Sequence, residues 1–104
     1  MKGIRYLPLA LHVVGDTLHL FFSRIGDTPE AIQYCRVSLH SDWHNWQVTT
    51  PQEILRPVDA WEGAQLPVEQ SMPGVAARAV HALRDPDIFC DDDGTFYLLY
   101  CGAG

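Results

Sequence analysis

The sequence has little positive charge and no long apolar run. It contains 7 Lys and Arg against 13 Asp and Glu, a formal net charge of -6 at pH 7, so we expect no basic surface for a phosphate backbone. The apolar stretch near the N-terminus is interrupted by Pro8 and His12 and lacks a small-residue cleavage site, which argues against a signal peptide or an anchor. The sequence therefore predicts neither a nucleic-acid nor a membrane partner.

Cysteine is also scarce, and no Cys-x-x-Cys pair occurs. Any intramolecular disulfide among Cys35, Cys90 and Cys101 leaves one thiol unpaired, which is typical of a chain in a reducing compartment. We therefore predict a cytoplasmic protein in which all three cysteines are small buried residues. The sequence also lacks a Gly-x-Ser-x-Gly elbow and a Gly-rich phosphate loop, so nothing in it supports acyl transfer or nucleotide hydrolysis.

Short β-branched and aromatic runs, separated by turn residues, make up most of the 104 residues. No window keeps helical spacing of its apolar residues over three turns, so the pattern predicts an all-β chain that forms a single domain. Its first part is predicted to be a four-stranded antiparallel meander with a two-residue turn at Gly15-Asp16. The predicted strands cover residues 4–14, 17–25, 31–39 and 46–50 with 53–55, the last being an edge strand because of its prolines.

The second part predicts a connection over residues 58–82, in which residues 75–82 fit either a fifth strand or a short helix. Residues 83–104 then predict another hairpin, with strands over 87–90 and 96–101. An offset of 78 residues, 86 minus 8, aligns this hairpin with the first, Pro86 falling on Pro8. A meander of about residues 4–57 followed by the same opening hairpin indicates consecutive blades of a β-propeller.

Three segments resemble a known family. The segment LRDPDIF of residues 83–89, followed by an acidic turn and GTFYLLYCG, resembles the blade opening of the five-bladed propeller glycoside hydrolases called family 43-like, the arabinanase, xylosidase and levansucrase/invertase group. The segment RVSLHSDWHNW of residues 36–46 is similar to the hairpin between the third and fourth strands of those blades. Residues 51–57 resemble their exit segment. The resemblance covers little more than one blade of five.

This resemblance implies a carbohydrate site at the Arg84-Asp85-Pro86 step. Asp85 corresponds to the carboxylate that orients the sugar and tunes the pKa of the general acid in related enzymes, and Arg84 could hold its charge. Such enzymes also need two carboxyls across the scissile bond, about 5–9.5 Å apart, and Leu7 stands at the equivalent place in the first repeat. Whether the chain is an enzyme therefore stays open. The alternative role of Asp85 is to cap the turn beside Pro86.

Aromatic residues supply the other candidate contacts. Trp46 is expected to pack between neighbouring sheets, whereas Trp61, in the long connection, is the better candidate for stacking on a sugar. Arg84, Asp85 and Trp61 are thus the predicted substrate-binding residues.

The sequence assigns no metal site. The acidic turn of residues 91–94 does not fit an EF-hand, because with Gly94 at position six the first and last ligands would be Phe89 and Tyr100. His40 and His44 lie in a turn without a third ligand. The remaining histidines stand singly among apolar residues and are predicted to be structural; they are His12, His19 and His81.

A lone blade leaves an apolar face uncovered, so we expect a homo-oligomer in which the C-terminal hairpin of one copy completes a blade of the next. A ring of copies would gather several Asp85 carboxylates, where calcium is the expected cation. Three functions stay open: a glycan-binding relative of the glycosidase propellers with little or no hydrolysis, a glycosidase whose site is assembled between chains, and an adaptor module without a sugar site. For the second, the glutamates available in or after the fourth strand are Glu53, Glu62 and Glu69.

Overall fold

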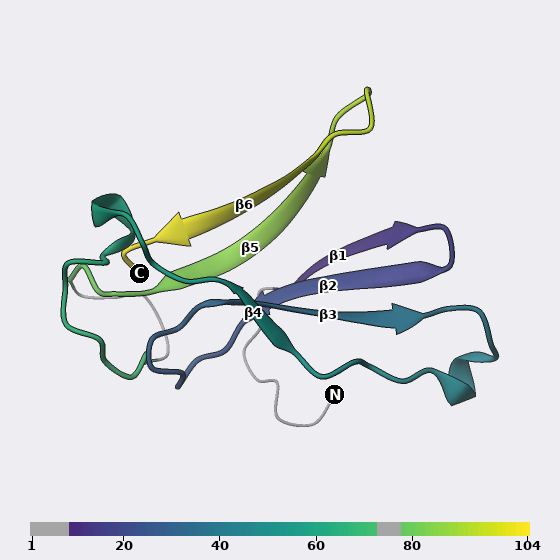
Figure 1. Ribbon diagram of the computed structural model, residues 1–104, viewed down its shortest axis with the longest axis horizontal. Helices are drawn as coiled ribbons and strands as arrows, with labels where there is room; N and C mark the ends of the chain where they lie inside the picture. Colours follow the sequence, from purple (N-terminus) through teal and green to yellow (C-terminus); the bar gives the residue numbers. More distant parts are fainter. Residues whose placement is uncertain (1–8, 73–77) are drawn as a thin grey trace.

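The computed structural model describes residues 9–72 and 78–104, which form an all-β structure of two antiparallel sheets (Figure 1). A four-stranded sheet has the order β1-β2-β3-β4, and a separate two-stranded sheet is the hairpin β5-β6. The described elements are β1 (Leu9–Val14), β2 (Thr17–Ser23), β3 (Ile32–Ser38), the 3-10 helix η1 (Trp43–Asn45), β4 (Gln52–Leu55), the 3-10 helix η2 (Ala60–Glu62), β5 (Leu83–Cys90) and β6 (Phe96–Gly102). The predicted meander and the second hairpin are confirmed.

The local turn chemistry explains the first hairpin. Gly15 has a φ of 56°, the positive value required at the first central position of a type II′ turn, and Val14 pairs with Thr17 across it. At the other edge of the sheet β4 pairs only with the first part of β3. The predicted strand over residues 46–50 is reduced to a single bridge between Val37 and Val48, so this edge is shorter than the sequence suggested.

The long connection differs from its prediction. Residues 78–82 form neither a strand nor a helix, and β5 begins at Leu83, four residues before the predicted strand. Residues 75–77 of the predicted fifth element, and residues 4–8 of the first predicted strand, lie outside the described part. No helix in residues 9–72 or 78–104 has the length and apolar character needed to cross a membrane.

The four-stranded sheet buries side chains on both faces. One face carries a core cluster, which consists of Leu20, Phe22, Cys35 and Val37 with Leu9, Leu18 and Leu39 packed around it. The opposite face is covered by β5, which contacts β1, β2 and β3. Figure 1 shows the β5-β6 hairpin close to the sheet at its base and diverging from it toward the tip. The Leu83 N–H donates to the carbonyl of Glu30 at 2.8 Å, which fixes this base.

The cysteine prediction is only partly right. Cys35 is fully buried, but Cys90 and Cys101 are exposed free thiols, because the β5-β6 hairpin has one face that nothing in the described residues covers.

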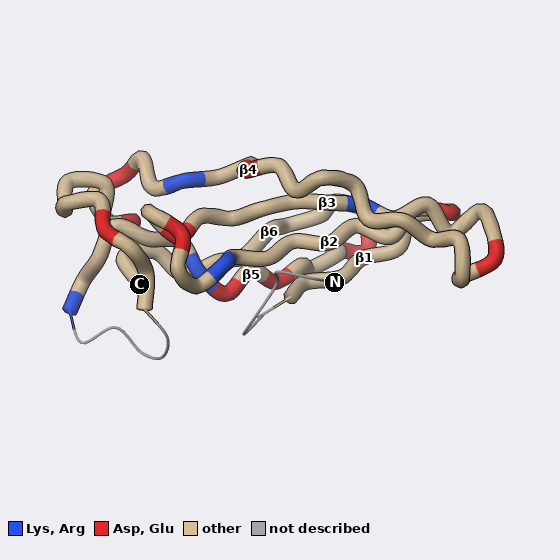
Figure 2. The backbone as a smooth tube through the Cα atoms, turned by 90° about the horizontal axis from the view of Figure 1, so that it is seen from below, with Lys and Arg blue, Asp and Glu red and all other residues tan. Residues whose placement is uncertain are grey.

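Charged side chains lie mainly in loops and at strand ends, and Lys and Arg are few and scattered (Figure 2). Of the five arginines in the described part of the chain, four pair with carboxylates; the pairs are Arg24–Asp27, Arg56–Glu53, Arg78–Glu69 and Arg84–Glu30. Paired guanidinium groups offer less positive potential to a phosphate than free ones do.

Candidate functional site

Asp85 lies on a β-bulge in β5. The pairing of β5 with β6 shifts between Arg84 and Asp87, and within this shift Asp85 has a φ of 55°. Among non-glycine residues, aspartate is one of the few that tolerate this left-handed conformation, which still costs free energy unless the surroundings impose it. The Asp85 side chain is exposed to solvent. The bulge therefore presents a carboxylate at a defined point of the strand.

Directly before the bulge, Arg84 is buried in a polar network that sequence reasoning missed. Its Nε lies 2.9 Å from Oε1 of Glu30, and its Nη2 donates to the carbonyl of Met72 at 2.9 Å. Glu30, which is 2% exposed, also accepts a hydrogen bond from the hydroxyl of Ser23. Arg84 thus ties the base of β5 to the β2–β3 loop and to the connection. Its identified carboxylate partner is Glu30, where we had expected Asp85.

A second network lies on β6, opposite the bulge. The register places Tyr100 across from the bulge, between the pairs Arg84–Cys101 and Asp87–Leu99. The Tyr100 hydroxyl donates to Oε2 of Glu62 at 2.7 Å, and the backbone N–H groups of Val58 and Asp59 both donate to Oε1 at 3.0 Å. These bonds anchor η2 against β6.

This network shifts two pKa values. Burial raises the pKa of the Glu62 carboxyl, but the hydrogen bonds from Val58, Tyr100 and Asp59 outweigh it and leave the pKa below its ordinary value. The hydrogen bond to Glu62, together with burial and the charges of Glu62 and Asp59, raises the pKa of Tyr100 to about 12. Glu62 is thus an ionised buried acceptor with a structural role.

Trp61 is positioned by the same network. Its indole stacks on the Tyr100 ring with centroids 5.7 Å apart and planes 23° from parallel, and it lies over the backbone of Gly102. A Cβ at Gly102 would come within 2.6 Å of Cζ3 of Trp61, so the absence of a side chain there creates the seat for the indole. Trp61 nevertheless remains 58% exposed. The register and the stack bring Asp85 and Trp61 to the same end of the β5-β6 hairpin.

The other sequence candidates have structural partners. Glu53 pairs with Arg56 and Glu69 pairs with Arg78, so neither stands beside Asp85 as a free second carboxylate. Trp46 is 42% exposed, and its Nε1 donates to the carbonyl of Ser41 at 2.8 Å. The prediction that Trp46 packs between sheets is wrong for the described residues, since this bond holds its own turn.

The acidic turn of residues 91–95 is satisfied by its own backbone. The N–H of Asp92 donates to Oδ1 of Asp91, and the N–H of Thr95 donates to Oδ1 of Asp93, which holds the pKa of Asp93 below its usual range. Gly94 supplies a φ of 87°. These bonds account for the acidic residues as turn formers.

The two turn histidines each face an aspartate. His40 Nδ1 lies 3.7 Å from Asp16, and His44 Nδ1 lies 2.7 Å from Asp42. In the described part of the chain no group of three or more His, Cys, Asp or Glu side chains could hold a metal ion.

Comparisons with known proteins identify one similar chain by sequence. No protein-family model matches, and no solved structure matches. A protein of Acanthamoeba polyphaga mimivirus, described only as uncharacterized, is 41% identical over 109 aligned residues. The alignment covers 100% of this chain but only 30% of that relative. The chain therefore spans about a third of the length of the relative it matches.

Proposed function

We propose that this chain is a glycan-binding unit of a β-propeller, consisting of one blade and the opening hairpin of the next. The observation that carries the proposal is the exposed Asp85 carboxylate, held at positive φ on the bulge of β5 with the partly exposed Trp61 at the same end of the hairpin. A carboxylate beside an aromatic platform suits a sugar, because the hydroxyls donate hydrogen bonds and the apolar ring face stacks.

The propeller part of the proposal is supported by the repeated hairpin and by length. β1-β2 and β5-β6 are both antiparallel hairpins, and their sequences align at an offset of 78 residues. The mimivirus relative, of which this chain covers 30%, has a length of about 350 residues, enough for four to five units of that size. Propellers of this class have four to eight blades.

Binding without hydrolysis fits the acidic side chains better than catalysis does. Glycoside hydrolysis needs two carboxyls flanking one bond. The glutamates that sequence reasoning offered as partners for Asp85 are engaged elsewhere, Glu62 in a buried network and the others in ion pairs. We therefore place hydrolysis second to binding.

Self-association completes the proposal. The outer face of β5-β6 exposes Phe89 at 54%, Tyr97 at 46% and Leu99 at 54%, a row of apolar residues typical of a face that packs on another sheet. We propose that a second copy covers this face, much as one blade covers the next. Light scattering over a dilution series tests this step directly: a mass that stays at one chain at the highest concentrations contradicts it.

The glycan test uses Asp85→Asn, because asparagine tolerates the same left-handed backbone and only the charge is lost. Retention of the protein on gels that contain arabinan, xylan or levan is the measurement, and we expect the variant to bind at least ten-fold more weakly. The matched control is Asp92→Asn, which makes the same charge change at the other end of the hairpin. Equal retention of wild type and Asp85→Asn, or no retention of either, rejects the glycan proposal.

Trp61→Ala gives a second, independent probe. If the indole stacks on the sugar, this variant loses retention even where circular dichroism shows an unchanged sheet signal. Sugar release detected with wild type but not with Asp85→Asn would instead favour the glycosidase whose site is assembled between chains.

A further inference from the structure

We propose that His12 and His19 form a binding site for a first-row transition metal ion such as Zn²⁺ or Ni²⁺. The two residues stand directly opposite each other in the antiparallel pairing of β1 and β2. Directly opposed residues share one face of the sheet and have Cβ atoms about 4.5–5.5 Å apart. Although the two histidines are seven positions apart and looked isolated in the sequence, the hairpin makes them nearest neighbours.

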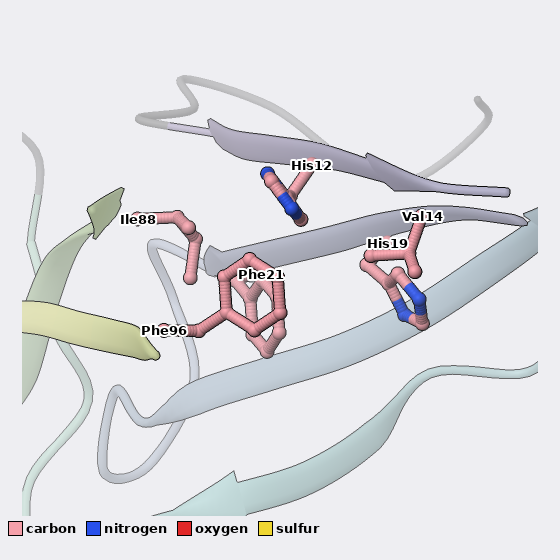
Figure 3. A pocket seen from close by; sticks show the side chains of 6 residues that line it. All are labelled: His12, Val14, His19, Phe21, Ile88 and Phe96. Carbon is pink, nitrogen blue, oxygen red and sulfur yellow. The ribbon is translucent and has the colours of Figure 1, made fainter. Parts of the chain in front are cut away.

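Both imidazoles project into one groove between the two sheets (Figure 3). The groove has a volume of about 230 Å³ and is lined by His12, Val14, His19, Phe21, Ile88 and Phe96. Its other lining residues are apolar, so the ring nitrogens are its main polar groups. Both histidines are half-buried and thus remain within reach of an ion from solvent.

The surroundings of His19 are those of a metal ligand. Its Nδ1 lies 2.6 Å from the hydroxyl oxygen of Tyr34, and the two rings stack with centroids 5.7 Å apart. When Nδ1–H donates to the Tyr34 hydroxyl, Nε2 carries the lone pair that a metal needs. Outer hydrogen bonds of this kind orient ligating histidines and raise their basicity.

His12 supplies the second nitrogen by turning its ring. At present it lies edge-on to Phe96 of β6 with centroids 4.5 Å apart, and the described contacts include no hydrogen bond to its nitrogens. Zn–N bonds of about 2.0–2.1 Å require the two nitrogens to lie at most about 4.2 Å apart, which opposed positions on a hairpin can reach by side-chain rotation. Binding therefore exchanges the contact with Phe96 for a bond to the ion.

The donor set determines the class of ion. Imidazole suits Zn²⁺, Ni²⁺ and Cu²⁺, whereas Ca²⁺ and Mg²⁺ prefer oxygen ligands, and the lining residues contain no carboxylate. Two protein ligands leave the remaining positions to water, so the site is expected to be weaker than a four-ligand structural zinc site.

The experiment is a calorimetric titration of the protein with ZnCl₂ and NiCl₂. The exposed thiols also bind these ions, so the titration is made in a Cys90→Ser, Cys101→Ser background. We expect one ion per chain, loss of binding in both His12→Gln and His19→Gln, and weaker binding at lower pH, since metals bind neutral imidazole. The matched control is His40→Gln with His44→Gln, because these histidines lie in exposed turns.

Tyr34→Phe separates a designed site from two adjacent histidines. It removes only the hydroxyl, and loss of such an outer partner typically weakens metal affinity about 10- to 100-fold. Because a histidine variant could also disturb the fold, proton NMR of the thiol-free protein with sub-stoichiometric Ni²⁺ gives a second readout, in which the ring protons of His12 and His19 should broaden first. Binding that survives either histidine variant, broadening confined to His40 and His44, or no binding at millimolar metal overturns the proposal.

Discussion

The base and the tip of the β5-β6 hairpin are built from different kinds of contact. At the base, Leu83 is fully buried, Arg84 pairs with the buried Glu30, and Gly102 receives the indole of Trp61. Toward the tip, Phe89 and Tyr97 contact each other at a centroid distance of 6.1 Å, yet each remains about half exposed. The hairpin is therefore attached at one end by specific polar and steric contacts and leaves an apolar surface at the other.

This difference separates what holds the chain together from what it can offer to a partner. Buried polar networks require their exact partners, whereas an exposed apolar row accepts any complementary surface. Variants at the base should therefore change the free energy of unfolding, and variants at the tip should change association. The following expectations run from the largest effect to the smallest.

Arg84→Met should have the largest effect. It leaves the Glu30 carboxylate buried without its guanidinium, and removal of one partner of a buried ion pair typically costs about 3–5 kcal/mol of unfolding free energy. Urea denaturation followed by circular dichroism measures the loss. The matched control is Arg24→Met, whose pair with Asp27 is partly exposed and should contribute less than about 1 kcal/mol.

The double variant Arg84→Met, Glu30→Gln sharpens this result. It removes both charges, so part of the lost stability should return. If the double variant is as unstable as the sum of the single variants, the ion pair does not connect the base of β5 to the β2–β3 loop.

Gly102→Ala should cost about 1–3 kcal/mol, because the added methyl group would lie 2.6 Å from Cζ3 and 2.8 Å from Cε3 of Trp61. The same substitution in a Trp61→Ala background should cost clearly less. Thermal unfolding of the four proteins gives the interaction energy, and a cost independent of Trp61 would show that the indole does not occupy this seat.

Tyr100→Phe should cost about 1 kcal/mol at neutral pH through the lost hydrogen bond to Glu62. The native pKa of about 12 exceeds the ordinary value of 10, so this contribution is fully present below pH 10 and is lost as the pH rises toward 12. An absorbance titration of tyrosinate should show one late-ionising group in the wild type. If Tyr100→Phe retains that late group, the pKa shift belongs to another tyrosine.

Leu99→Ser should have the smallest effect on folding, within about 0.5 kcal/mol, because the Leu99 side chain is 54% exposed. Its effect should appear in association, as a lower mass in light scattering at the same concentration. The control is Val58→Ser, which alters an apolar residue that is 74% exposed outside the outer face of the hairpin. Equal masses for both variants would indicate that this face is not the surface used.

The strand pattern was readable from the sequence because alternation and turn residues act locally. Gly15 predicts the first hairpin turn, and the aromatic and aliphatic run of residues 96–101 predicts most of β6. The sequence also pointed to Asp85 and Trp61, although their shared location at one end of the hairpin depends on the pairing of β6 with β5.

The networks around the candidate site could not be predicted in the same way. Glu30 and Arg84 are 54 positions apart, 84 minus 30, and Glu62 and Tyr100 are 38 apart, so only the folded arrangement shows that these polar groups are partners. The bulge was missed for a related reason, since a register shift is a property of two strands together. The exposed Cys90 was mispredicted because burial depends on a neighbouring sheet, which composition cannot specify.

The bulge at Asp85 also determines which neighbours the two halves of β5 meet. Side chains alternate along a strand, and an inserted residue reverses that alternation for every residue beyond it. Deletion of Asp85 would turn Phe89 toward the four-stranded sheet and Ile88 away from it, and the lining of the groove would change with them. A single inserted residue thus lets the base of the strand keep its buried anchors while its tip is free to evolve a different partner.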